Sequence, residues 1–400
     1  MPVYKADWVL PIAEAPIRDA WVAIENGRIV ALSSAPTSGA IDLGPAVILP
    51  ALVNAHTHLE LSYLRDVIQP ASRFLDWIGG VMAARRRYAD PEDPVIRAAA
   101  GAAIEEARAT GTGLIGDISN TLVTVPLLRQ AGMAARVFYE LLGFDVDDAG
   151  ERVRQARARV SSVDGGRDVH VALAPHAPYS VSRGLFAAIR EDIDAHPGDI
   201  STVHLGESPE EVELIVHGTG GWRDLLATLG MWPADWKVPG VSPVRYLTDI
   251  GFLDSRVIAV HGVQFEGEDL SRLRTLGVPV VSCPRSNRYV GVGDPPLEAF
   301  YAMGVTVAFG TDSLASVGDL NLFSDLARAR ELAPRVPARR LLESATLRGA
   351  AALGFGDELG SIEVGKRSAL IAVRLPSDAG DVEEYLLSGI EPGAITWLDS

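Results

Sequence analysis

The stretch AVILPALVNAHTHLELS, residues 46–62, begins as an apolar run and then places two histidines one residue apart, His56 and His58. Its first part is typical of a buried strand, because it is short and apolar at successive positions. A strand that ends in two imidazoles requires an explanation, because buried polar groups need partners. Residues two apart along a strand point to the same side, so both rings can serve as ligands on one rigid element.

Seven further apolar runs recur along the chain. They are GLIGDIS (113–119), ARVFYELLG (135–143), VHVALAPHAPY (169–179), ISTVHLGE (200–207), VIAVHGV (257–263), VPVVSCPRSN (278–287) and VTVAFGTDS (305–313). Helical patterns such as PVIRAAAGAAIEEARATG (94–111) lie between them. Buried strands that alternate with helices indicate an α/β protein with parallel units, and eight units predict a closed (β/α)8, TIM-like barrel. A doubly wound open sheet is the rival fold, but no glycine-rich phosphate turn follows the first strand.

The two ends of the chain show a pattern of short strands and turns instead of alternating strands and helices. Residues 3 to about 50 alternate as short strands, and WVAIENGRIVAL (21–32) predicts a hairpin that turns at Asn26-Gly27. Near the other end, GSIEVGKRSALIAVRLP (360–376) returns to strands and turns. We therefore expect residues 1–50 and 358–400 to form a small β-sandwich domain beside a barrel domain of residues 51–357.

Composition narrows the class of protein. The chain has 400 residues, 48% hydrophobic and 22% charged, which is ordinary for a soluble globular protein. No apolar run is long enough to span a membrane, and MPVYKADWVLPIAEAP lacks the pattern of a signal peptide, so we expect a cytoplasmic location. A net charge of −16 argues against nucleic acid or an anionic membrane as partner and leaves a small-molecule substrate. The single cysteine, Cys283, excludes a Cys-rich zinc site.

Polar residues follow most of the predicted strands. They are His56, His58, Asp117, Glu140, His176, His204, His261, Ser286, Asn287 and Asp312. In a barrel these strand ends surround one mouth, where barrel enzymes keep their active sites. A single histidine at such a place is more often a hydrogen-bonded core residue. We adopt that structural interpretation for His170, His196 and His217, and for Asp117 and Glu140.

Four of these residues together favour a metal site. His56, His58 and His204 supply imidazoles and Asp312 a carboxylate, which with an open position suit Zn²⁺, and also Fe²⁺ or Mn²⁺. A bound metal ion would activate water for hydrolysis. Glu207, three residues beyond His204 in HLGESPEE, is placed to move protons, while Ser208 is the better helix cap. We expect His261 to hydrogen-bond the attacking water or the leaving group.

The ordered motifs NAHTHLE, PHAPYS, HLGESPEE, AVHGV, CPRSN and GTDSLAS resemble those of the amidohydrolase superfamily. The resemblance covers nearly the whole chain. It is nearest to the mononuclear aminohydrolase branch, which holds adenosylhomocysteine, aminofutalosine and guanine deaminases and the s-triazine chlorohydrolases. It implies one divalent metal ion, because the fourth strand ends in His176 and no lysine that could bridge two metals occurs between Lys5 and Lys237. It also implies that His176 contacts the substrate.

The resemblance implies a mechanism of deamination. Metal-activated water attacks an amidine-like ring carbon, and Asp312 takes the water proton. Glu207 protonates the neighbouring ring nitrogen, His261 steadies the oxygen, and ammonia leaves. The zinc chemistry of cytidine deaminases, which needs paired cysteines, is excluded.

The substrate is predicted from fewer residues. Trp77 resembles a tryptophan that relatives place against the substrate, and Arg85 to Arg87 stand where adenosylhomocysteine deaminases carry a glutamate. These arginines would suit a distant carboxylate, such as the benzoate of 6-amino-6-deoxyfutalosine, or they form a solvated helix face. We also expect Glu60, Arg65 and Ser286 to contact the substrate.

Other functions remain open at the level of sequence. They are an adenosylhomocysteine, adenosine or guanine deaminase, a chlorohydrolase, a cyclic-amide hydrolase and, more remotely, a non-catalytic scaffold. A homodimer is expected by analogy with relatives.

Overall fold

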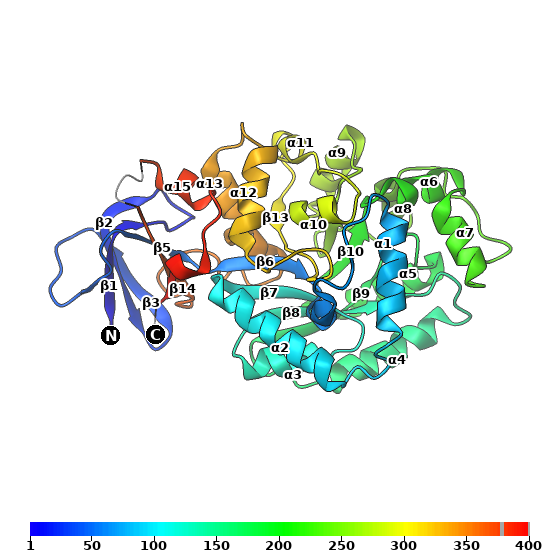
Figure 1. Cartoon of the computed structure of the whole chain (residues 1–400), viewed down its shortest axis with the longest axis horizontal. Helices are drawn as coiled ribbons and strands as arrows, with labels where there is room; N and C mark the ends of the chain where they lie inside the picture. The colour runs from blue at the N-terminus through cyan, green and yellow to red at the C-terminus, as the bar shows by residue number, and fades with distance from the viewer. Residues whose placement is uncertain (377–379, 399–400) are drawn as a thin grey trace.

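The computed structural model describes residues 1–376 and 380–398. A β-sheet at one end of the molecule adjoins a larger body in which helices surround strands, as Figure 1 shows. The first strand, β1 (Val3–Val9), and the late strand β14 (Leu370–Arg374) both lie at the sheet end (Figure 1). The protein is therefore a mixed α/β structure whose first and last segments meet.

The terminal sheet draws strands from both ends of the chain. These strands are β1 (Val3–Val9), β2 (Ile17–Glu25), β3 (Arg28–Ser33), β4 (Ile41–Asp42), β5 (Ala46–Pro50), β14 (Leu370–Arg374) and β15 (Ile395–Trp397). They form one seven-stranded sheet in the order β15-β14-β5-β1-β2-β3, with β4 beside β1. Asn26 and Gly27 join β2 to β3 at φ 51° and 72°, the left-handed conformations of a tight hairpin, so the predicted turn is confirmed. The predicted sandwich of two sheets stays a prediction.

The larger body contains the eight predicted parallel strands. They are β6 (Leu52–Thr57), β7 (Thr112–Ser119), β8 (Ala134–Leu141), β9 (Val169–Pro175), β10 (Ser201–Leu205), β11 (Val257–His261), β12 (Val280–Ser282) and β13 (Val307–Phe309). Each predicted run overlaps one of them. They form two four-stranded sheets, β6-β7-β8-β9 and β10-β11-β12-β13. Single backbone bonds join the two sheets at both borders: the His204 N–H donates to the His176 carbonyl (2.9 Å) and that of Asp312 to the His56 carbonyl (3.0 Å). The arrangement is TIM-barrel-like.

We had expected the apolar run of residues 46–56 to form one strand. The structure shows two strands there. β5 belongs to the terminal sheet, where it pairs with β1 and β14, whereas β6 pairs with β7 in the body. Ala51 stands between them and donates its N–H to the Ala369 carbonyl. Apolar sequence shows that a segment is buried but not in which sheet. This short connection ties the two parts of the molecule together.

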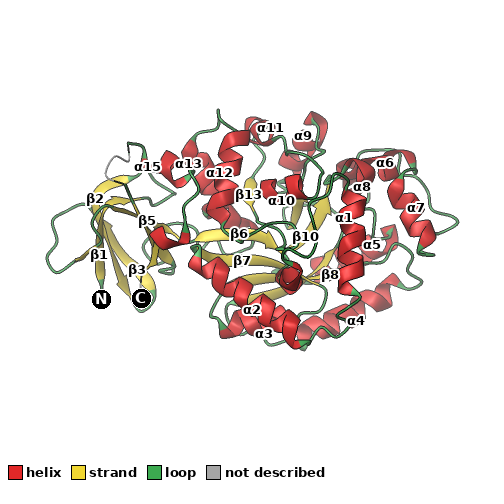
Figure 2. Cartoon of the chain, in the orientation of Figure 1, coloured by secondary structure: helices red, strands yellow, loops and turns green. Residues whose placement is uncertain are grey.

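Helices cover the strands of the body, as Figure 2 shows in red. They are α1 (Phe74–Arg85), α2 (Pro94–Ala109), α3 (Thr124–Gln130), α4 (Ala149–Ser161), α5 (Arg183–Ala195), α6 (Pro209–His217), α7 (Gly221–Thr228), α8 (Pro243–Asp249), α9 (Gly267–Leu276), α10 (Pro284–Tyr289), α11 (Leu297–Ala302), α12 (Leu322–Leu332), α13 (Ala338–Ser344), α14 (Leu347–Ala352) and α15 (Val382–Leu386). Two 3₁₀ helices are η1 (Leu59–Leu64) and η2 (Pro392–Ala394). Within residues 1–376 and 380–398, no helix is both long and apolar enough to cross a membrane.

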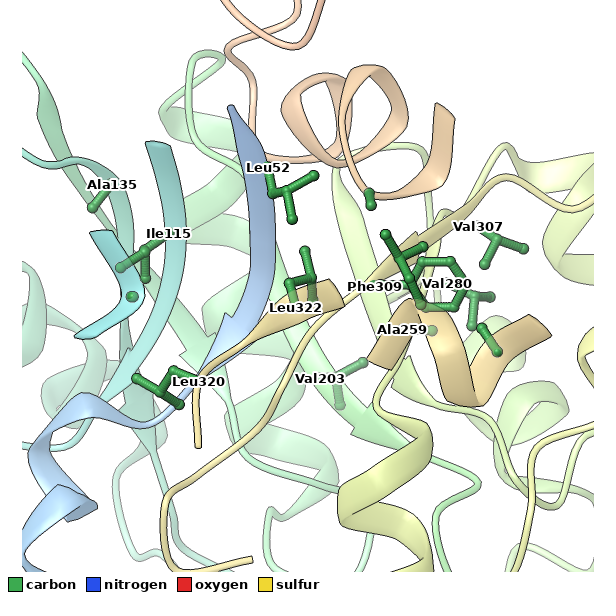
Figure 3. Packing of buried hydrophobic residues seen from close by; sticks show 14 of the residues in the cluster. Leu52, Ile115, Ala135, Val203, Ala259, Val280, Val307, Phe309, Leu320 and Leu322 are labelled. Carbon is green, nitrogen blue, oxygen red and sulfur yellow. The ribbon is translucent and has the colours of Figure 1, made fainter. Parts of the chain in front are cut away.

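The strands bury apolar side chains on both faces. One cluster joins strand residues such as Leu52, Ile115 and Val307 to apolar residues of the surrounding helices, and Figure 3 shows part of it. A second cluster draws residues from seven of the eight strands, including Val53 and Leu114, and adds apolar residues of the α14 segment. Neighbouring positions such as Leu52 and Val53 thus belong to different clusters, as expected for strands covered on both sides. The strand positions are therefore fixed by two packed layers.

Candidate active site

Four side chains converge at the carboxyl ends of strands that lie far apart in the sequence. His56 belongs to β6, His58 follows it, His204 belongs to β10, and Asp312 follows β13. Asp312 Oδ1 lies 3.7 Å from His56 Nε2 and 3.4 Å from His58 Nε2. His58 Nε2 lies 3.4 Å from His204 Nε2. The structure brings together all four residues that the sequence proposed as metal ligands.

Burial sets the charge of these groups. It lowers the pKa of His56 and of His204 well below the ordinary value, and it lowers the pKa of His58 as well. Burial alone would raise the pKa of Asp312, but the facing imidazoles of His58 and His56 hold it down at about 2. The set therefore consists of three neutral imidazoles and one carboxylate, the protonation states in which these groups bind metal ions.

The donor set fits a divalent cation. His56 Nε2 is buried and has no hydrogen-bond partner among the described residues. His204 Nδ1 lies 3.1 Å from the His176 carbonyl, so Nδ1 carries the hydrogen and Nε2 presents a lone pair. That lone pair faces Nε2 of His58, the next candidate ligand, at 3.4 Å. Donor atoms of His56, His58 and Asp312 lie within 4.8 Å of one another, and His204 Nε2 adjoins that of His58. Three imidazole nitrogens and one carboxylate oxygen are a ligand set that suits zinc.

Neighbouring groups hold Asp312 in place. Its Oδ2 accepts a 2.6 Å bond from the Ser286 hydroxyl, and its Oδ1 accepts a 2.8 Å bond from the Ser313 N–H. The backbone of Asp312 has φ 64°, an unusual conformation for an aspartate and one that recurs at functional sites. Ser286 is buried beneath the carboxylate and does not line the cavity described below, so our expectation that it contacts the substrate is replaced by a positioning role.

A second carboxyl group lies beside this set. Glu207 Oε1 is 3.6 Å from His261 Nε2, and burial raises the pKa of Glu207 well above its ordinary value. Glu211 fixes the chain at this point, since its two carboxylate oxygens accept bonds from the N–H groups of Gly206 (3.0 Å) and Glu207 (2.9 Å). The Ser208 hydroxyl caps α6, which confirms that Glu207 is not the helix cap. The carboxyl group of Glu207 is thus buried and makes no hydrogen bond with any described residue.

His261 is oriented by one hydrogen bond. Its Nδ1 lies 2.9 Å from Asn287 Oδ1, which is an acceptor, so the ring hydrogen is on Nδ1 and Nε2 is free to accept. Burial lowers the pKa of His261, which keeps the ring neutral. His261 has φ 76°, a second left-handed residue at a strand end. The sequence showed Asn287 only as one of the polar residues that follow the predicted strands. It gave no signal that Asn287 would bond His261.

A cavity of about 260 Å³ opens beside these groups. His58, His176, His204, Glu207, His261 and Asp312 line it, together with apolar and aromatic residues that include Phe74, Trp77, Trp222, Leu226 and Met231. Trp77 lies in this wall and packs in stacked fashion on Phe74. His176 also lies in the wall, where burial and then the charge of Arg85 lower its pKa to about 4. An apolar pocket with a few convergent polar groups is the usual form of a small-molecule site.

The three consecutive arginines, Arg85 to Arg87, differ in their position relative to this cavity. Arg85 lines the wall, whereas Arg86 and Arg87 are exposed. The interpretation as a solvated helix face is right for two of the three. Both terminal nitrogens of Arg85 lie 3.2 Å from Asn120 Oδ1, and Asn120 Nδ2 donates to Glu140 Oε2 at 2.9 Å.

Glu140 continues this connection to the metal-binding set. Its Oε1 lies 3.5 Å from Nδ1 of His204, and Glu140 also lines the cavity. The structural role expected for Glu140 therefore includes a contact that orients the candidate ligand His204. Its place at the end of a parallel strand was the signal for this role in the sequence.

Comparison with known proteins shows the family to which the chain belongs. The sequence profile of the amidohydrolase family matches residues 47–391, which is most of the chain. The chain belongs to the amidohydrolase family. It is a hydrolase that acts on carbon–nitrogen bonds other than peptide bonds.

Two curated relatives are similar over most of their length. One is the aminodeoxyfutalosine deaminase of Deinococcus radiodurans, 32% identical over 322 residues, or 77% of this chain and 74% of that protein. The other is the 5-methylthioadenosine/S-adenosylhomocysteine deaminase of Halobacterium salinarum, 32% identical over 377 residues, or 89% of this chain and 79% of that protein.

Two solved structures share the fold. An adenosine deaminase from Xanthomonas campestris with bound zinc is 29% identical, with a TM-score of 0.83 over 98% of this chain and 90% of that one. The Helicobacter pylori aminofutalosine deaminase in complex with methylthio-coformycin is 25% identical, with a TM-score of 0.85 over 99% of this chain and all of that one.

Two predicted substrate contacts of this amidohydrolase lie outside the cavity. The Glu60 carboxylate accepts bonds from the Ser119 hydroxyl and from the backbone of Asn120 and Thr121, so it is used in holding the loop after β7. Arg65 pairs with Glu106 at 2.5 Å instead. Neither residue lines the cavity. Both follow β6 in or directly after η1, and Glu60 Oε1 lies 3.7 Å from the guanidinium of Arg85, which does line the cavity.

The residues interpreted as structural lie where that interpretation places them. Asp117 accepts bonds from the Leu59 N–H and the Thr124 hydroxyl. His170 contacts Phe355, His196 Nδ1 lies 2.7 Å from the Asp192 carbonyl, and His217 ends α6. None of these four lines the cavity.

Proposed function

We propose that this amidohydrolase is a metal-dependent hydrolytic deaminase of an adenosine-type purine nucleoside, with 6-amino-6-deoxyfutalosine as its substrate. The observation that carries the proposal is the convergence of the candidate ligands His56, His58, His204 and Asp312 beside a separate buried acid, Glu207, which lines one cavity together with His58, His204 and Asp312. Deamination needs both, because one group must activate water while another protonates the ring. Both curated relatives named above are nucleoside deaminases.

One divalent metal ion, zinc in the first instance and Fe²⁺ or Mn²⁺ in the second, is proposed to bind His56, His58, His204 and Asp312. When bound, such an ion lowers the pKa of a water molecule and supplies a hydroxide nucleophile at neutral pH. The zinc in the similar adenosine deaminase supports the choice of metal. Metal analysis of the purified protein tests it, and a stoichiometric content of one ion per chain is expected.

The remaining steps fall to side chains of the protein. Asp312 Oδ1, which faces both His56 and His58, takes the proton that the attacking water loses. Glu207, held protonated by its raised pKa, donates to the ring nitrogen beside the reacting carbon. His261 Nε2 accepts a hydrogen bond from the attacking oxygen. The carbon–nitrogen bond then breaks as the proton on Asp312 passes to the amine, and the hydroxyl on the ring carbon returns its proton to Glu207, so that ammonia leaves a ring carbonyl behind.

The choice of substrate rests on Arg85. The substrate 6-amino-6-deoxyfutalosine carries a benzoate far from the purine amine, and an arginine in the cavity wall can pair with that carboxylate through two parallel N–H donors. His176 and Trp77, in the same wall, are proposed to contact the nucleoside. The similarity to two proteins named for this activity supports the choice.

Adenosylhomocysteine or methylthioadenosine deamination is the second candidate, favoured by the Halobacterium relative. Ammonia release from 6-amino-6-deoxyfutalosine, S-adenosylhomocysteine, methylthioadenosine, adenosine and guanine decides between them. We expect kcat/KM to be largest for the first compound. Preference for an uncharged nucleoside would contradict the assignment, and turnover of none of the five would refute deamination itself. In that case chloride release or ring-opened acid from a triazine or a cyclic amide is the next readout.

The larger organisation is part of the same proposal. The eight strands are taken as a closed barrel domain of residues 51–357, supported by the backbone bonds at both borders of the two sheets. Residues 1–50 and 358–400 are taken as the second domain. A cytoplasmic homodimer acting on a small molecule remains our prediction, to be tested by light scattering.

A further inference from the structure

A second cavity lies at the opposite end of the barrel strands. It has a volume of about 420 Å³ and is lined by the first residues of β7 and β8, Thr112 and Ala134. The Asn26-Gly27 hairpin turn and Trp397 close it from the terminal sheet, so it occupies the junction that Figure 1 shows between the sheet and the α/β body. The candidate metal ligands lie at the carboxyl ends of the strands, and none of them lines this second cavity.

The lining of this junction cavity is strongly basic. Four arginines and one aspartate line it: Arg28, Arg108, Arg167, Arg367 and Asp168. The count gives an excess of three positive charges, in a chain whose net charge is −16. Asp168 is paired with Arg367 at 2.9 Å, and Glu358, which is not in the lining, lies 3.8 Å from the same guanidinium. Three of the arginines therefore have no carboxylate partner among the described residues.

These three arginines keep donors free. Arg108 donates to the Ala131 carbonyl (3.2 Å) and lies with its guanidinium 5.4 Å from the centre of the Trp397 indole. Arg28 donates to the Gly365 carbonyl. Arg167 has no hydrogen bond or ion pair with any residue of the described ranges. Like charges that share one concavity repel each other, and an anion bound between them removes this repulsion.

We propose that the junction cavity is a binding site for a small organic polyanion that bears phosphate or carboxylate groups. The guanidinium fork matches both groups, and arginines contributed by three separate segments favour a ligand with at least two negative charges. The volume of about 420 Å³ is that of a site for a small metabolite. The inference does not depend on the proposed deaminase function, because the two cavities share no residue.

Binding is measured by calorimetry and thermal shift on the metal-loaded protein at low ionic strength, with pyrophosphate, AMP and citrate as probes. A ligand that binds only the folded protein raises the melting temperature with its concentration. The test variant is Arg108→Gln with Arg167→Gln. The control is Arg154→Gln with Arg245→Gln, which removes the same charge from two exposed arginines outside both cavities.

We expect at least one probe to bind, and its Kd to rise by about tenfold or more in the test variant while the control keeps the wild-type value. A phosphate-bearing probe alone, or citrate alone, then identifies the class of anion. Equal weakening in both variants would show a general charge effect and overturn the proposal. Unchanged binding in the test variant, or no binding by any probe, would do the same.

Discussion

His261 Nδ1 and Asn287 Oδ1 lie 2.9 Å apart, and this single contact decides which nitrogen of His261 faces the cavity. We predict that Asn287→Ala lowers kcat by about 10-fold to 100-fold with little change in KM, since loss of such a supporting bond has effects of this size. Asn287→Asp restores an acceptor and should recover much of kcat. If the two variants lose activity equally while both remain folded, Asn287 does not orient His261.

Replacement of Glu207 separates acid–base chemistry from metal binding. Glu207→Gln keeps the shape of the side chain but cannot give up a proton. We expect kcat to fall by about 10²-fold or more while the metal content remains one ion per chain. Glu210→Gln, three residues further along and partly exposed, is the matched control and should be fully active. Turnover by Glu207→Gln at the wild-type rate would remove Glu207 from the mechanism.

The role of Arg85 is tested by comparing two substrates. With Arg85→Gln, we expect KM for 6-amino-6-deoxyfutalosine to rise by about 10-fold to 100-fold, the range of a lost charge-assisted hydrogen bond. KM for adenosine, which has no carboxylate, should change little. Arg86→Gln removes the same charge from an exposed neighbour and should alter neither value. A similar loss for both substrates would mean that Arg85 supports the structure instead.

Gly310 lies against the backbone of the metal-binding strand β6. A Cβ atom at this position would meet the carbonyl oxygen of His56 at 2.7 Å and its nitrogen at 2.9 Å. We predict that Gly310→Ala lowers the free energy of unfolding by about 1–3 kcal/mol, as in overpacked cores, and lowers the metal content. Gly318→Ala is the control, because no atom of the described residues lies within 4 Å of its Cβ position. Denaturant unfolding and metal analysis of the two variants give the answer.

Removal of the metal ion should destabilise the fold. A ligand that binds only the native state contributes about 4 kcal/mol at a thousand times its Kd, so chelation is expected to lower Tm and zinc to restore it. His204→Ala should abolish the response to zinc. His196→Gln should keep the response to zinc. His196 does lie close to Asp192 and Asp199, but Arg157 already pairs with both of those aspartates. If the response to zinc depended on His196, the metal would bind at the cluster of Asp192, His196 and Asp199, and the proposed site would be wrong.

The convergence of the candidate metal ligands could be predicted from the sequence because topology alone brings them together. The carboxyl ends of parallel strands meet at one mouth, so His56, His204 and Asp312 become neighbours whatever the loops do. Glu207 was predictable for the same reason, since it lies only two residues after β10.

Residues further from a strand end could not be placed in this way. Glu60 and Arg65 depend on the course of η1, and Ser286 on the orientation of α10, which no periodic pattern records. Arg85 and Arg86 are adjacent in the sequence, and only the end of α1 decides that one lines the cavity. The division of residues 46–56 into β5 and β6 was hidden for another reason, because both strands are fully buried and therefore look alike.

The pairing of β5 with β14 also bears on how the polypeptide is made. Val47 pairs with Val373, which the ribosome adds 326 residues later (373 − 47). Throughout synthesis of the body, β5 presents one unpaired edge, and exposed strand edges are where chains associate wrongly. The nascent protein therefore depends on its last strands to close that edge, and premature termination before β14 is expected to yield aggregates instead of a shorter enzyme.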